Sequence, residues 1–113
     1  MAIYATKFKE DIFKDFPGAR SFPIFDSENT PLHGCSAMLN IFSDDQYKTP
    51  GVHDDNEGFY VISGEGMAMI GIDEYVLTPG TAIYAPAWIP HALKKTGDED
   101  LKVFIYHFPV TKY

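Results

Sequence analysis

The sequence has little cysteine, which proteins of oxidising compartments use for disulfides, and few basic residues, which proteins use to bind nucleic acid. Cys35 is the single cysteine in 113 residues, so no internal disulfide can form, and this is typical of a reducing compartment. Lysine and arginine together number 9 against 16 acidic residues, which gives a net charge of −7. Because a surface of this charge repels polyanions, we predict that nucleic acid is not a partner.

Long hydrophobic runs are also missing. The most apolar stretch, around residues 82–93, is broken by Pro86, Pro90 and His91 and is unsuited to crossing a bilayer. The first residues, MAIYATKFKED, lack the apolar centre of a signal peptide. We therefore expect a soluble, cytoplasmic protein without a membrane partner.

Helical periodicity is scarce after residue 30. Short runs rich in β-branched and aromatic residues alternate instead with turns rich in Gly, Pro and Asp, a pattern typical of a β-sandwich or small barrel. The runs are CSAMLNIF, GFYVIS, MAMIGI, EYVLT, TAIYA, HALKK and LKVFIYHF. The sequence thus predicts an all-β fold, and its length predicts a single domain over residues 1–113.

The first thirty residues leave two alternatives open. In KFKEDIFKDF, the spacing of Phe8, Ile12 and Phe16 fits one face of a short helix, which PGAR would end. An extended arm packed along a sheet edge fits the segment equally well.

Two stretches carry candidate metal ligands. In GVHDDNEGFYVISGEG, residues 51–66, His53 precedes Glu57 by four positions, and strand alternation puts Glu57 and Phe59 on one face. In PGTAIYAPAWIPHALKKTG, residues 79–97, His91 opens a strand after a loop that two prolines make rigid, which limits the freedom of this side chain. Taken alone, His53 also fits a solvated turn histidine.

Together the two stretches resemble the motifs of the cupins, G-x5-H-x-H-x3or4-E-x6-G followed by G-x5-P-x-G-x2-H-x3-N. The first motif lies at about residues 51–66 and the second at about 80–95. The matching positions are His53, Glu57, Gly64, Gly80, Pro86 and His91. The resemblance implies a cupin-type double-stranded β-helix, a jelly-roll barrel, preceded by a short N-terminal arm.

Four positions depart from the cupin pattern. Asp45 stands in place of the opening glycine and Gly51 in place of the first histidine. Trp88 replaces the inner glycine of the second motif, and Lys95 replaces its closing asparagine. Cupins usually hold their metal with three histidines and one glutamate, so the resemblance carries over only part of that set.

The metal ligands that the resemblance retains are His53, Glu57 and His91. Two imidazoles and a carboxylate with open positions suit a divalent transition metal such as Fe, Mn, Ni or Zn. The residues considered for a fourth ligand are Asp54, Asp55, His33 and His107. His107 shares a strand face with Val103 and Ile105, although the sequence does not say whether that face points inward.

The resemblance implies a small metal-binding cupin that acts on a polar small molecule in its barrel, with oxygenase, sugar isomerase or epimerase, or decarboxylase chemistry. The alternative is a non-catalytic cupin that binds or senses a small ligand and has a degenerate metal site. A third alternative is a structural, dimer-forming barrel with a vestigial site. The candidate substrate-binding residues are Phe59, Tyr84, Trp88 and Lys95, for which core packing or a surface position is the competing interpretation.

We also expect a homodimer, because small cupins often pair through an outer sheet face. The side chains expected to supply an apolar surface for this contact are Tyr60, Ile62, Phe104, Tyr106 and Phe108.

Overall fold

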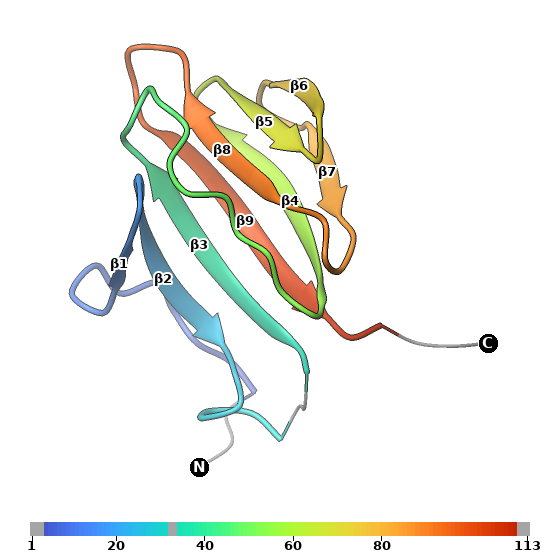
Figure 1. The fold of residues 1–113 in the computed structure, drawn as a ribbon. Coiled ribbons are helices and arrows are strands. Elements are labelled where there is room, and N and C mark those ends of the chain that lie inside the picture. The colour runs from blue at the N-terminus through green and yellow to red at the C-terminus, as the bar shows by residue number, and fades with distance from the viewer. Residues whose placement is uncertain (1–3, 32–33, 111–113) are drawn as a thin grey trace.

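The computed structural model describes residues 4–31 and 34–110, and these residues form nine β-strands and no helix (Figure 1). The all-β prediction is therefore confirmed. The strands are β1 (Lys14–Phe16), β2 (Ala19–Phe25), β3 (Ser36–Phe42), β4 (Asn56–Ser63), β5 (Gly66–Ile70), β6 (Asp73–Leu77), β7 (Ala82–Ala85), β8 (His91–Lys95) and β9 (Leu101–Phe108).

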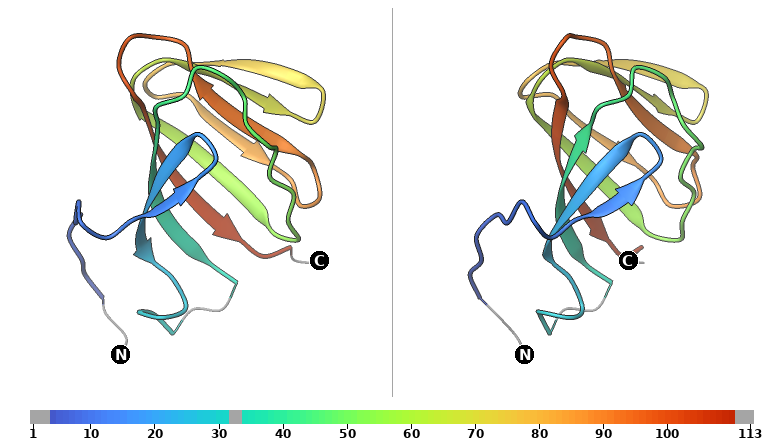
Figure 2. Two further views of the ribbon diagram at one scale, coloured as in Figure 1. Left: turned by 60° about the vertical axis from the view of Figure 1, so that its left-hand side comes forward. Right: turned by 90° about the vertical axis from the view of Figure 1, so that its left-hand side faces the viewer.

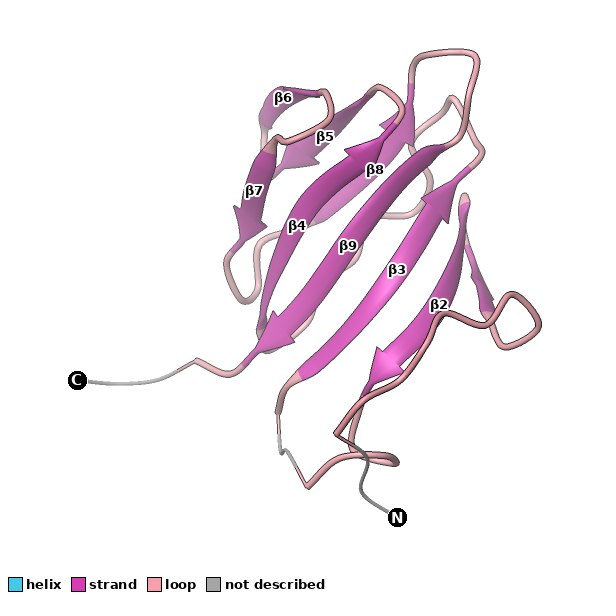
Figure 3. Cartoon of the chain, turned by 180° about the vertical axis from the view of Figure 1, so that it is seen from behind, coloured by secondary structure: helices cyan, strands magenta, loops and turns pink. Residues whose placement is uncertain are grey.

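The strands make two antiparallel sheets that face each other. The larger has the order β1-β2-β3-β9-β4-β7, most of which is visible side by side in Figure 3, and the smaller has the order β6-β5-β8. Figure 2 shows the smaller sheet lying against one part of the larger, with the β1–β2 hairpin at the far end. The C-terminal strand β9 lies between β3 and β4, which is the kind of crossover that makes a jelly-roll barrel.

The core lies between the two sheets and follows from strand alternation. On β4, Phe59 and Val61 are buried whereas Tyr60 and Ile62 are exposed, and on β9 Val103 and Ile105 are buried. Burial of each such large side chain stabilises the fold by about 1.5–3 kcal/mol. The whole core cluster consists of Phe42, Phe59, Val61, Ala68, Leu77, Ala85, Leu93, Leu101, Val103 and Ile105.

The N-terminal segment is an extended arm, so its interpretation as a helix is wrong. The rings of Phe8 and Phe13 pack on Phe22, with centroids 4.9 and 5.7 Å away, and the edge strand β1 pairs with β2. Strand β2 escapes detection in the sequence because Pro23 interrupts its alternation. The register with β3 shifts between Pro23 and Phe25, as is usual where a proline enters an edge region of a sheet.

The outer face of β4 and β9 carries the aromatic side chains expected at a dimer contact. Phe104 and Phe108 each stack against Tyr106, with centroids 6.0 and 5.7 Å apart, and Tyr84 stacks against Phe108 at 6.2 Å. The homodimer itself stays a prediction. The described part of the chain has no helix with the length and apolarity needed to cross a membrane.

Candidate metal centre

The loop between β3 and β4 brings His53 to the edge of the smaller sheet. The Lys95 amide donates to the Asp44 carbonyl at 3.1 Å, so the loop leaves β3 alongside β8. Farther along, Gly51 and His91 form an isolated bridge, in which each amide donates to the other's carbonyl at 2.8 and 3.1 Å. This pairing fixes the loop along the length of β8, as Figure 1 shows, and places His53 close to the start of that strand.

The turn bounded by Pro86 and Pro90 is hydrogen-bonded to the segment that carries His53, and it leads directly into His91 at the start of β8. The Trp88 amide donates to the His53 carbonyl at 2.8 Å, and the Ala87 amide donates to the side-chain oxygen of Asn56 at 3.0 Å. Trp88 has a φ of 67°, which side-chain-bearing residues adopt only rarely. The tryptophan thus has the left-handed backbone that a glycine adopts more easily.

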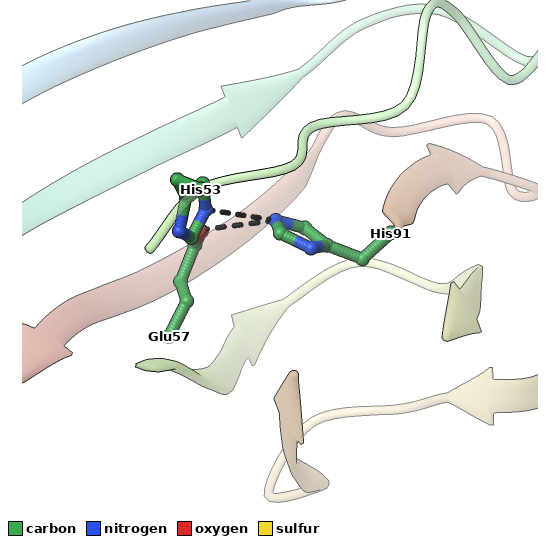
Figure 4. A group of neighbouring side chains, drawn as sticks. All are labelled: His53, Glu57 and His91. Atoms are coloured by element: carbon green, nitrogen blue, oxygen red, sulfur yellow. Dashed lines mark hydrogen bonds and ion pairs between the residues drawn. The ribbon is translucent and has the colours of Figure 1, made fainter. Parts of the chain in front are cut away.

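The side chains of His53, Glu57 and His91 converge on one point (Figure 4). Glu57 Oε1 lies 2.7 Å from His53 Nε2 and 3.1 Å from His91 Nε2, and the two nitrogens are 3.3 Å apart. Glu57 and His91 are buried, and His53 is half-buried. The structure therefore brings together the three residues that the motif spacing selected.

The hydrogen bonds on the far side of each imidazole orient a lone pair toward this point. His91 Nδ1 lies 3.0 Å from the Ile89 carbonyl, which can only accept, so this nitrogen carries the hydrogen and Nε2 is bare in the neutral ring. His53 Nδ1 lies 2.5 Å from Asp55 Oδ1, which also only accepts when ionised. Two bare nitrogens and a carboxylate oxygen thus face one another, an arrangement that requires protons or a cation.

A divalent transition-metal ion fits this donor set. For metal–ligand bonds of about 2.1 Å, neighbouring ligand atoms in an octahedral or tetrahedral site lie about 3.0–3.4 Å apart. The three observed separations, 2.7, 3.1 and 3.3 Å, lie close to that interval. His53, Glu57 and His91 could accordingly bind one side of a metal ion and leave its other coordination positions open to further ligands.

The electrostatics of the triad favour charged groups. Burial alone would raise the pKa of Glu57, but the hydrogen bond from His91 and the nearby His107 and His53 outweigh it and hold this pKa below its usual value. Burial opposes the charged form of His91 too, yet the contacts to Glu57 and to the Ile89 carbonyl raise its pKa above the usual value. In the metal-free protein, these contacts therefore favour the protonated form of His91 and the ionised form of Glu57.

These two shifts predict how pH affects the stability of metal-free protein. A lowered Glu57 pKa contributes stability that is present above the ordinary value of 4.5 and is lost as the pH falls through the folded value. A raised His91 pKa contributes stability that is present below 6.5 and is lost as the pH rises through the folded value. We expect urea unfolding in the presence of a chelator to show this contribution at its largest between those two pH values.

With Zn²⁺ present, we expect the opposite effect of pH on stability above this pH range. The metal competes with the proton for His91, so stabilisation by Zn²⁺ should increase between about pH 6 and about pH 8. Urea titrations with chelator and with Zn²⁺, run in parallel, measure both trends. A metal-free protein that becomes more stable over this interval, by the same amount as the zinc-treated sample, would contradict the prediction.

The remaining candidate ligands occupy different places. His107 lies on β9 opposite Glu57 in the strand register, and its Nε2 is 3.6 Å from Glu57 Oε1, so its strand face does point inward. Asp55 lies between His53 and His107, with Oδ2 3.2 Å from His107 Nδ1. Asp54 is exposed, and His33 lies outside the described residues.

A cavity of about 300 Å³ opens beside the triad. Its walls are mainly apolar, and the N-terminal arm contributes Phe16 and Pro17 to them. Asn40 also lines the cavity, and its side-chain oxygen is buried without a hydrogen-bond partner among the described residues. Sequence analysis did not select Asn40, although alternation along β3 with the buried Phe42 was a signal that it faces inward.

The four residues predicted to bind substrate do not lie together. Phe59 lines the cavity. Tyr84 and Trp88 are exposed, and Tyr84 stacks on Phe108 of the outer face. Lys95 donates to the Asp98 carbonyl at 3.4 Å in the turn that follows β8. Tyr84, Trp88 and Lys95 are thus not among the residues that line the cavity. Only for Tyr84, whose neighbour Ala85 is buried, does strand alternation supply the reason.

The fold and the triad define a small jelly-roll protein with a mixed imidazole–carboxylate centre in its barrel. Comparison with models of protein families identifies the family of this chain. A family model described as a cupin domain matches residues 44–107, and the chain belongs to the cupin family. The family resemblance read from the two motifs is thereby confirmed.

Solved structures agree with this fold, whereas no curated protein matches the chain. The plu4264 protein from Photorhabdus luminescens has a TM-score of 0.77 at 18% identity, covering 96% of this chain and 88% of its own. KdgF from Halomonas sp. has a TM-score of 0.71 at 18% identity, with coverage of 96% and 97%. The polyketide cyclase RemF from Streptomyces resistomycificus has a TM-score of 0.76 at 15% identity, with coverage of 93% and 79%. At these identities the likeness concerns the fold alone.

Proposed function

We propose that this cupin is a metal-dependent enzyme whose cavity binds a small molecule through one of the molecule's oxygen atoms. The observation that carries the proposal is the convergence of two imidazole Nε2 atoms and a carboxylate oxygen, within 3.3 Å of one another, at the wall of the cavity. Without protons or a cation between them, these partly buried groups would face one another with unpaired lone pairs, which is unfavourable.

A bound Fe, Mn, Ni or Zn ion would act there as a Lewis acid, polarising a substrate oxygen or lowering the pKa of a bound water. The chain's own residues do the rest. Glu57 stays ionised because its pKa is low, and the Ile89 carbonyl fixes the orientation of His91. Apolar side chains such as Phe59 and Ile105 keep bulk water from the reacting end of the cavity.

The walls of the cavity also narrow the class of substrate. The volume of about 300 Å³ lies at the lower end of the range for small-molecule pockets. Apart from the triad and His107, the polar residues of the lining are Ser21, Asn40, Lys48 and Thr49. A molecule with an apolar body and an oxygen-bearing end for the metal suits the apolar walls, and these polar residues offer hydrogen-bond partners for its other groups.

Elemental analysis of protein purified without added metal is the first test. We expect close to one transition-metal ion per chain. The metal-loaded protein is then mixed with a panel of small aromatic and aliphatic keto and hydroxy acids, while an oxygen electrode and carbon dioxide detection follow turnover. Absence of metal at every stage of purification and after reloading would overturn the proposal. Tight binding of panel members without any turnover would instead assign a non-catalytic binding role.

A further inference from the structure

We propose that Asn40, with Ser21 beside it, forms a second polar subsite inside the cavity, remote from the triad, where the Asn40 side-chain oxygen accepts a hydrogen bond from the ligand. The ligand is then an elongated molecule that has a metal-binding oxygen at one end, an apolar middle, and a hydroxyl or amide N–H at the other end. This subsite deepens the proposed function, on which it rests, by specifying the class of ligand.

Ser21 and Asn40 lie side by side on the inner face of the larger sheet. They are cross-strand partners in the pairing of β2 with β3, so their side chains leave the sheet on the same face, and both line the cavity. Ser21 is only 3% exposed. The next residue of β2, Phe22, points to the opposite face, where the N-terminal arm packs on it. The polar pair therefore belongs to the interior of the cavity.

The surroundings of Asn40 leave its side-chain oxygen unpaired. Met38 and Phe42 lie on the same face of β3, and Val103 is the partner of Asn40 on β9, so these neighbours are apolar. Within residues 4–31 and 34–110, no group donates a hydrogen bond to this buried oxygen. Because a buried amide oxygen without a partner is unfavourable, a ligand with a hydrogen to donate would gain affinity here.

An apolar stretch of wall separates this subsite from the triad. On β9, Val103 pairs with Asn40, whereas His107, four positions later, pairs with Glu57. At about 3.4 Å per residue, the two levels are roughly 13 Å apart along the strand, and β9 also separates β3 from β4 (Figure 3). The lining residues at the level between them are Met38, Phe59 and Ile105. A ligand that contacts both ends therefore needs an apolar middle.

The other two polar residues of the lining, Lys48 and Thr49, are less suited to select a ligand. Both are exposed, and Lys48 Nζ already lies 2.9 Å from Asp44 Oδ2 in an ion pair. A ligand that makes no hydrogen bond to such groups leaves them to water at little cost. The Asn40 oxygen is buried, so a ligand that leaves it unpaired binds at a greater disadvantage.

Matched straight-chain acids test the subsite on the native chain. Each carboxylic acid is used in three forms, which end in a hydroxyl, a methyl ether or a methyl group, in a series that lengthens by one methylene at a time. Calorimetry measures binding to Co²⁺-loaded protein, and the Co²⁺ absorption reports whether the carboxylate reaches the metal. At the length that spans both ends, we expect the hydroxyl form to bind about 10-fold more tightly, because it alone donates to Asn40.

The outcomes separate this subsite from the proposed metal function. If the three forms bind equally at every length while still changing the Co²⁺ spectrum, the metal function stands and the subsite is wrong. A methyl ether that binds as tightly as the hydroxyl would also overturn the subsite, because the contact would then be to a donor. A chain that binds no Co²⁺ would overturn the metal function, and the preference for the hydroxyl form in metal-free protein would then decide on the subsite alone.

Asn40→Leu tests the same oxygen by removing it with little change in side-chain size. We expect this variant to lose the preference for the hydroxyl form and, without ligand, to unfold at a higher urea concentration, because no unpaired oxygen is buried. Thr49→Val, at the exposed rim, is the comparison variant and should keep the preference. Loss of the preference in Thr49→Val but not in Asn40→Leu would overturn the subsite. A lower urea midpoint for Asn40→Leu would do the same, since the oxygen would then be satisfied without a ligand.

Discussion

Replacing Glu57 with alanine is expected to lower the affinity for Co²⁺ or Zn²⁺ by more than about 100-fold. Removing a residue that only hydrogen-bonds to a metal ligand usually lowers the affinity by about 10–100-fold. Glu57 supplies the negative charge among the nearby ligands, and its Oε1 lies within 3.6 Å of Nε2 of His53, His91 and His107. Without this oxygen, the remaining donors are neutral imidazoles, and the ion loses both a bond and its charge compensation.

The absorption spectrum of bound Co²⁺ during titration measures this affinity. Glu99→Ala is the matched control, because Glu99 is an exposed carboxylate in the turn between β8 and β9 and its loss changes the net charge equally. Chelator-treated samples of both variants should be unfolded in urea alongside, so that a folding defect is not mistaken for a lost ligand. Unchanged Co²⁺ affinity in Glu57→Ala would show that the convergence of His53, His91 and Glu57 does not bind metal.

The triad could be predicted from the sequence because its determinants are local. His53 and Glu57 are four positions apart, and the strand beginning at Asn56 fixes the face to which Glu57 points. His91 follows a turn that two prolines make rigid. Each of these features depends on spacing, alternation or proline geometry, which are written directly in the chain.

The rest of the site depends on which strands become neighbours. His107 was one candidate among several, and only the pairing of β9 with β4 puts it opposite Glu57. The contribution of Phe16 and Pro17 to the cavity depends likewise on an arm whose conformation the sequence left open. Strand alternation also cannot tell which face of β7 is the outer one, which is why Tyr84 was expected in the cavity.

Trp88 shows a further limit of motif reading. A tryptophan in place of a motif glycine suggests that the turn has changed, yet its φ of 67° keeps a left-handed backbone there. Its amide donates to the His53 carbonyl, so the turn still ties the two histidine-bearing segments together. A side-chain-bearing residue can thus hold a left-handed backbone in this turn, because the surrounding hydrogen bonds offset the strain.

Two motif glycines, Gly64 and Gly80, should respond very differently to the same substitution. Both have a positive φ, 83° and 91°, where alanine is strained by about 1–2 kcal/mol. A Cβ on Gly64 would also run into the Asp100 carbonyl oxygen and lie 2.9 Å from Leu101 Cα, both of them backbone atoms, whereas a Cβ on Gly80 meets nothing within 4 Å. Overpacking of this kind costs about 1–3 kcal/mol more.

We therefore expect Gly64→Ala to lower the free energy of unfolding by about 2–5 kcal/mol and Gly80→Ala by about 1–2 kcal/mol. Urea unfolding of the two variants in chelator measures the difference, which isolates the steric contribution because the backbone strain is common to both. Equal losses would mean that the chain at Asp100 moves aside without cost. A larger loss in Gly64→Ala would show that this glycine is required by the close approach of the chain after β4 to the start of β9, so that the position demands space as well as a left-handed backbone.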